Sequence, residues 1–260
     1  MTDLSRRNLL KAGAASVAGV GAVVATMPGG REAGAGALAQ DAHVSQPHDQ
    51  TQGRTSEATG VLFFFNDQEA AFIRAAVDRL IPPDPAWPGG AEADVLTYID
   101  RQLAGAYGAG ERMYLNGPWL ADAPPQQGYQ LRFTPAQLYQ IGIEETRKHV
   151  RDTNNGREFW ELTDTGMDAV LTGLENGGIT LPSLPAPVFF ETLLANTVEG
   201  FFADPAYGGN RDMAGWRMVG FPGAYAQYLD LVDVYGYAYS RPPIGMANDA
   251  ARRAHIAGHR

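Results

Sequence analysis

The sequence has 260 residues and contains no cysteine. This absence excludes disulfides, iron–sulfur clusters, thiol nucleophiles and the Cys-x-x-Cys-His attachment of c-type haem. Lysine is almost absent as well, since only Lys11 and Lys148 occur, and the formal net charge is −9. Binding to a phosphate backbone requires a basic surface, which this chain lacks, so we expect no nucleic-acid partner.

The common catalytic motifs are also missing. The sequence has no P-loop and no Gly-x-Ser-x-Gly elbow, and the segment YGGNRDMAG at 207–215 does not follow a predicted strand, as a dinucleotide fingerprint would. Four of the five histidines lie in predicted tails, and His149 stands alone in a predicted helix, so no metal frame is evident. We therefore assign no catalytic, cofactor-binding or metal-ligating residue.

What the chain does have is an N-terminal segment typical of export, residues 1–39. Arg6 and Arg7 stand in SRRNLLK, and an uncharged stretch rich in Ala, Gly and Val follows from Ala12 to Met27. This stretch is too short for a membrane-spanning helix, and the Ala-Leu-Ala ending at Ala39 provides a cleavage pattern. The arginine pair resembles the twin-arginine signal, which predicts export of the folded chain by the twin-arginine translocase. The alternative is a Sec-type signal that happens to contain two arginines.

The remaining chain divides by composition into three parts. Removing residues 1–39 leaves 16 basic and 27 acidic residues, a formal charge of −11. Residues 40–60 are polar and poor in apolar side chains, which predicts a disordered, flexible arm. Residues 61–240 are predicted to form a single compact helical domain, and residues 241–260 a flexible tail.

Helical periodicity predicts a mainly α fold with long ordered loops. Helices are expected over 67–81, from Val95 to about Leu103, from Pro135 to about Arg151, over 164–174 and over 188–202. Asn66 with Glu69, and Thr134 with Gln137, have the spacing of capping boxes. On the third helix, Glu144 and Lys148 are expected to form an exposed pair. Residues 109–133 predict a long irregular loop, which in a compact domain usually has a function or a partner.

The segment TVEGFFADPAYGGNRDMAGWRMVGFPG at 197–223 mixes aromatic residues with arginines and aspartates. Aromatic and arginine side chains are the types that anchor protein interfaces. We therefore interpret this segment as a partner surface. The alternative is that it folds back on its own core, with Arg211 paired to Asp204 or Asp212, and the two interpretations are compatible.

Part of this segment, EGFFADPAYGGNRDMAGWRMVGFPGA, resembles the C-terminal signature of subunit 3, the small subunit, of gluconate 2-dehydrogenase. The resemblance covers about residues 62–225, and three other segments agree in order: LIPPDPAWPGGAEADVLTYIDRQL at 80–103, YLNGPW at 114–119 and GYQLRFTPAQLYQIGI at 128–143. The same family includes the small (gamma) subunits of membrane-bound FAD-dependent fructose, sorbitol and glucose dehydrogenases.

The resemblance implies a complex that oxidises the CH–OH group of a sugar or sugar acid. A large subunit with FAD would perform the oxidation, and a multihaem cytochrome c subunit with haem c would pass the electrons to ubiquinone. The small subunit would be non-catalytic and would hold no cofactor. It would escort the large subunit, which typically lacks an export signal, to the periplasm and stabilise it there, with the complex associated with the cytoplasmic membrane through the partner subunits.

By the same resemblance, we expect the partner interface on two segments, the turn WPGGAEA at 87–93 and the loop that follows Phe202. The candidate residues are Trp87, Glu92, Arg211, Asp212, Trp216 and Arg217. Two alternatives use the 203–222 loop region differently. A free-standing periplasmic enzyme would require turnover by the isolated chain, and a solitary binding protein would require a preformed concave site.

Overall fold

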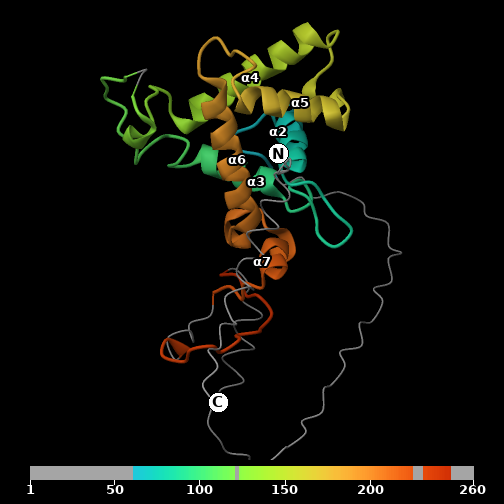
Figure 1. Ribbon diagram of the computed structural model, residues 1–260, viewed down its shortest axis with the longest axis vertical. Coiled ribbons are helices and arrows are strands. Elements are labelled where there is room, and N and C mark those ends of the chain that lie inside the picture. The colour runs from blue at the N-terminus through green and yellow to red at the C-terminus, as the bar shows by residue number, and fades with distance from the viewer. Residues whose placement is uncertain (1–60, 121–122, 225–230, 247–260) are drawn as a thin grey trace, which may run out of the picture. The chain divides into compact units, whose positions relative to one another are not determined.

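The computed structural model describes residues 61–120, 123–224 and 231–246 (Figure 1). The described α-helices are α2 (Asp67–Leu80), α3 (Val95–Ala104), α4 (Pro135–Thr153), α5 (Asp164–Glu175), α6 (Ala186–Phe202) and α7 (Ala214–Val219). Short 3-10 turns stand between them: η1 (Pro125–Gln127), η2 (Phe159–Glu161), η3 (Pro205–Tyr207) and η4 (Arg211–Met213). Within these ranges there is no β-strand, only an isolated bridge between Gly223 and Ile244. The predicted mainly α fold is therefore confirmed.

The signal peptide and arm predicted for residues 1–60, with Arg6 and Arg7, lie outside the described residues. The same holds for residues 247–260 of the predicted tail. Among the helices that the structure describes, none is both long and apolar enough to cross a membrane.

Local capping fixes the beginning of α2 and of α4. The Asn66 side chain accepts from the backbone N–H of Gln68 and Glu69 at 3.0 Å, and the Glu69 carboxylate accepts from the Asn66 N–H at 3.0 Å. Thr134 and Gln137 form the same reciprocal pair at α4, so both predicted capping boxes are present. The predicted Glu144–Lys148 pair is wrong, because Lys148 binds Asp152 at 2.9 Å. Acidic residues stand one turn away on both sides of Lys148, and spacing alone does not choose between them.

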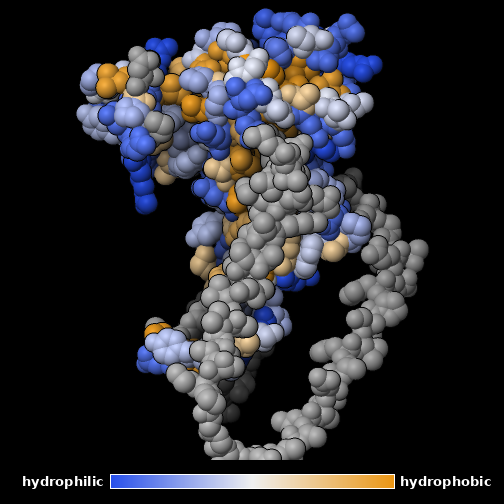
Figure 2. Space-filling view, in the orientation of Figure 1, coloured by the Kyte–Doolittle hydropathy of each residue, from blue (hydrophilic) through white to orange (hydrophobic). Residues whose placement is uncertain are grey.

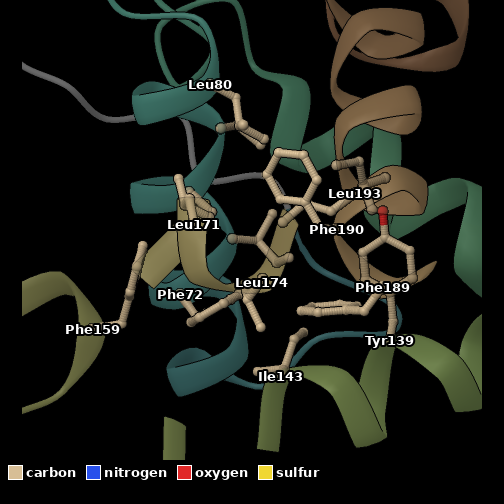
Figure 3. Packing of buried hydrophobic residues seen from close by; sticks show 14 of the residues in the cluster. Phe72, Leu80, Tyr139, Ile143, Phe159, Leu171, Leu174, Phe189, Phe190 and Leu193 are labelled. Carbon is tan, nitrogen blue, oxygen red and sulfur yellow. The ribbon is translucent and has the colours of Figure 1, made fainter. Parts of the chain in front are cut away.

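The core lies where α2, α3, α4, α5, α6 and η2 meet, and Figure 3 shows part of it. The rings of Phe72 and Phe159 lie 4.8 Å apart, and Tyr139 meets Phe189 edge-on at 5.9 Å. Gly142 allows this packing, because a Cβ on that residue would lie 2.4 Å from the Phe189 ring. The close approach of α4 to α6 therefore depends on a residue without a side chain.

Two arginines join the elements around this core. Arg79 of α2 binds two aspartates of α5, Asp164 at 2.6 Å and Asp168 at 2.8 Å. Arg147 of α4 binds Glu158 at 2.8 Å, and the hydrogen bond from this guanidinium lowers the pKa of Glu158. These ion pairs join different segments of the chain. Because their geometry is directional, they fix the orientation of elements that apolar contacts alone would hold without direction.

A buried carboxylate in α3 positions the start of the described chain. The side chain of Asp100 accepts the backbone N–H groups of Phe63, Phe64 and Phe65 at 2.8 to 3.0 Å. Buried charges require such hydrogen-bond partners, and here three donors converge on one carboxylate. Helical periodicity does not predict this role, although Asp100 lies between Leu96 and Leu103 on the apolar face of the helix.

Candidate functional site

The segment predicted as a partner surface, 197–223, begins in the last turns of α6. We call residues 203–217, which follow this helix, the Gly-Asn-Arg-Asp loop. Asn210 lies buried at its centre. Its side-chain amide donates to the Ala203 carbonyl at 2.7 Å and accepts from the Gly215 N–H at 2.8 Å. Both hydrogen bonds cross the loop, so Asn210 closes it into a fixed shape.

Trp216 of α7 fastens the loop to the helix that precedes it. Its indole N–H donates to the Phe202 carbonyl at 2.7 Å, which satisfies one of the backbone groups that a helix end leaves without an intrahelical partner. The side chain is only 7% exposed. Trp216 therefore supports the loop from inside, while the neighbouring Phe221, which meets its ring edge-on at 5.1 Å, is exposed.

The backbone of this loop is unusual because five of the six residues from Gly208 to Met213 have positive φ. Asp212 and Met213, at 57° and 55°, adopt this conformation without being glycine. Such residues cost about 1–3 kcal/mol each and persist where the surroundings determine the conformation, often at functional sites. The loop is thus held in one shape at a cost in stability.

The loop meets the turn that joins α2 to α3, and we call residues 82–94 the proline turn. The Arg211 N–H donates to the Ala93 carbonyl at 3.0 Å, and the Arg211 guanidinium binds the Asp94 carboxylate at 3.1 Å. The two predicted interface segments are therefore neighbours in space. The pairing of Arg211 with Asp204 or Asp212 is wrong, because the Asn210 turn directs Arg211 toward α3.

The candidate interface residues differ in how far they reach the surface. Four are exposed and one is half-buried, whereas Trp216 is buried; the exposed ones are Glu92, Arg211, Asp212 and Arg217, and the half-buried one is Trp87. The proline turn that carries Trp87 is itself fixed, because the Asp78 carboxylate of α2 accepts the Ala91 N–H at 3.1 Å. The exposed charges thus stand on two ordered segments.

The chain returns to this region after residue 230. The Ile244 N–H donates to the Pro222 carbonyl at 3.1 Å, and the Met246 N–H donates to the Asp204 carboxylate at 2.7 Å. Residues 241–260 were expected to form a flexible tail, but within the described part Ile244 pairs with the segment after α7 and Met246 binds the Gly-Asn-Arg-Asp loop. Backbone hydrogen bonds of this kind are made by any residue type, so composition could not reveal them.

Next to the loop lies a cavity of about 560 Å³, open to solvent. It is lined by Tyr98, Gln102, Glu199, Phe202, Ala203, Asp204 and Tyr207. Burial, and next the charge of Glu199, raise the pKa of Tyr98 to about 12, so this hydroxyl stays protonated at neutral pH. The lining contains two carboxylates and no basic side chain, which disfavours an anionic ligand.

A polar network joins Glu199 of the cavity lining to buried Tyr139. Asn196 of α6 accepts from the hydroxyls of Tyr139 and Tyr107 at 2.9 and 3.3 Å and donates to Glu199 at 2.9 Å. Burial raises the pKa of both tyrosines. Their hydroxyls therefore act as hydrogen-bond donors, and the network orients Glu199.

A second, smaller cavity of about 330 Å³ lies in the long loop between α3 and α4. Its lining is uncharged: Met113, Tyr114, Gly117, Pro118, Trp119, Gln127, Tyr129 and Gln130. The loop predicted at 109–133 is thus present and exposes aromatic side chains, Tyr114 most of all.

The glycines of the loop and the acidic side chains of the described residues can be compared with the patterns of dinucleotide and metal sites. Among them, no group of three or more His, Asp or Glu side chains could hold a metal ion. A Cβ on Gly208 would lie 3.0 Å from the Tyr98 nitrogen, and one on Gly209 would lie 2.2 Å from the Gly200 carbonyl oxygen. These glycines face protein backbone and follow a helix, whereas the glycines of a dinucleotide site follow a strand and face the phosphates.

The family described as gluconate 2-dehydrogenase subunit 3 matches the chain over residues 67–223. This range begins at the first residue of α2, includes the proline turn and the Gly-Asn-Arg-Asp loop, and ends at Gly223. No curated protein and no solved structure matches the chain.

Proposed function

Because the chain belongs to the gluconate 2-dehydrogenase subunit 3 family, we propose that it is the non-catalytic small subunit of a periplasmic, membrane-associated, FAD-dependent complex of the gluconate 2-dehydrogenase type. In this proposal it serves as the twin-arginine export escort and as a stabiliser of the flavin subunit. Its partners are the large FAD-containing subunit, a multihaem cytochrome c subunit and the twin-arginine translocase. The family match carries the proposal.

The geometry of the Gly-Asn-Arg-Asp loop supports a docking role. Asn210 and Trp216 fix the loop from inside, and Asp212 and Arg217 are exposed on it. A surface that is ordered before binding loses less conformational entropy when a partner arrives. Rigid support for exposed charged residues is what a subunit interface requires.

The predicted export signal in residues 1–39 supports the escort role. A twin-arginine signal directs folded proteins, so a signal on the small chain would also export a large chain already bound to it. The absence of cysteine agrees with this route, because the chain needs no disulfide formed after export.

The polar groups that a free-standing enzyme would use already have structural partners. The two carboxylate oxygens of Asp204 accept the backbone N–H groups of Ala206 and Met246, and Arg211 binds Asp94. These contacts hold the loop together, so they support a structural role for Asp204 and Arg211.

The direct test is co-expression with the large subunit, followed by fractionation. Dye-linked oxidation of gluconate, glucose, fructose and sorbitol is measured in the periplasm and the cytoplasm for the wild-type chain, for Arg6→Lys with Arg7→Lys, and for Lys11→Arg as the matched control. We expect activity in the periplasm with the wild type and the control, and in the cytoplasm with the double lysine variant. Periplasmic activity that persists without the arginine pair would contradict the escort role.

A further inference from the structure

The cavity beside the Gly-Asn-Arg-Asp loop combines two carboxylates with aromatic walls. Glu199 lies on α6, Asp204 lies just after the same helix, and Tyr98, Phe202 and Tyr207 contribute rings. No lysine or arginine belongs to the lining. The cavity therefore presents a negative charge that its own walls do not neutralise.

Both carboxylates are held in place by neutral donors. Asp204 accepts two backbone N–H groups, from Ala206 at 2.9 Å and Met246 at 2.7 Å. Glu199 accepts from the Asn196 amide at 2.9 Å. A carboxylate offers about four lone-pair sites, so each has capacity left for a further donor. The two carboxylates are therefore oriented but have no cationic partner in the lining, so they are suited to bind a cationic ligand.

The aromatic walls favour one kind of cation. Cations are attracted to the faces of aromatic rings, and a guanidinium group can stack on a ring while its N–H groups bind carboxylates. An ammonium group is more strongly hydrated and lacks the planar shape. The lining thus fits an arginine side chain better than a lysine side chain.

The surroundings of the cavity indicate where this arginine comes from. Figure 2 shows apolar side chains along α6 between hydrophilic ones. Leu194, Val198 and Phe202 are half-buried and stand at one-turn spacing on this helix, and Phe202 lines the cavity. Tyr207, which also lines the cavity, belongs to the Gly-Asn-Arg-Asp loop. An apolar strip beside a charged pocket is the arrangement of an interface with an arginine anchor.

We propose that this cavity receives an arginine side chain of the large FAD-containing subunit. The proposal rests on the proposed function and adds to it the chemistry of the contact, a guanidinium placed between Glu199, Asp204 and aromatic rings. It also places the interface on the α6 side of the loop, beyond the residues expected from the sequence.

The first experiment compares Glu199→Gln with Glu191→Gln in the full chain co-expressed with the large subunit. Both positions are exposed on α6, two turns apart, and in Glu199→Gln the new amide oxygen can still accept from Asn196. We expect Glu199→Gln to weaken the complex about tenfold, and Glu191→Gln to leave its dissociation constant unchanged. If the wild type binds and Glu199→Gln binds equally well, the arginine pocket is wrong; if the wild type does not bind, the proposed function itself fails.

The second experiment uses a small probe on the full chain without the large subunit. N-acetyl-arginine methylamide and its neutral citrulline counterpart are titrated while NMR signals of the protein are followed. We expect the arginine probe to bind several-fold more tightly than the citrulline probe, and the difference to disappear in Glu199→Gln. Equal binding of the two probes to the wild type would overturn the assignment.

Discussion

The core formed by α2, α4, α5 and α6 buries rings and aliphatic side chains, whereas the Gly-Asn-Arg-Asp loop buries an amide and backbone groups. Apolar packing is non-directional and tolerates changes that conserve volume. Hydrogen bonds to a buried amide are directional, and positive φ values restrict which residues fit. The packing of the core thus stabilises the fold, and this stability offsets the cost of the strained loop conformation at the surface.

The largest effect should follow from Asn210→Ala. This change leaves the Ala203 carbonyl and the Gly215 N–H without their partner and places alanine at a left-handed position, φ 43°, so we expect a loss of about 2–4 kcal/mol in the free energy of unfolding. Urea denaturation measures it. Asn155→Ala is the control, because Asn155 has φ 56° but an exposed side chain. Equal losses for the two variants would mean that the buried amide does not hold the loop.

A smaller effect is expected from Gly142→Ala in the core. The added methyl group would lie 2.4 Å from the Phe189 ring, and such overpacking costs about 1–3 kcal/mol, offset in part by the better helix propensity of alanine. The control is Gly166→Ala in α5, where the nearest atom lies 3.3 Å away and we expect a change below about 1 kcal/mol. Thermal unfolding compares the two. A stabilised Gly142→Ala protein would contradict the close approach of α4 to α6.

These two changes should also separate stability from binding. Gly142→Ala alters the core and leaves the loop intact, so the folded fraction should bind the large subunit normally. Asn210→Ala should weaken binding even where the protein is folded. If both variants lower the affinity for the large subunit equally, the loop has no binding role that is separate from the stability of the core.

The difference between the regions also explains what the sequence could predict. The helices were predictable because period, caps and terminating residues are local: the Asn66 and Thr134 capping boxes are read from four residues each. The resemblance to the subunit 3 signature placed the loop among the expected interface segments. Exposure was not predictable, since Trp216 and Arg217 are adjacent in sequence but opposite in burial.

Contacts between distant segments could not be predicted from the sequence. Arg211 has several aspartates near it in sequence, and only the fold shows that it binds Asp94. Asp100 carried a signal that was missed, a carboxylate within an apolar helix face. The helix α7, with six residues, is too short to show a helical period.

The central claim, that the exposed charges of the loop form a subunit interface, is tested most directly by the affinity of the full chain for the large FAD-containing subunit. Arg217→Ala should change the free energy of unfolding by less than about 0.5 kcal/mol, because the side chain is exposed, and should weaken binding about tenfold. Arg157→Ala, an exposed arginine after α4, should change neither quantity. If Arg217→Ala binds the large subunit as tightly as Arg157→Ala does, the loop is not the interface.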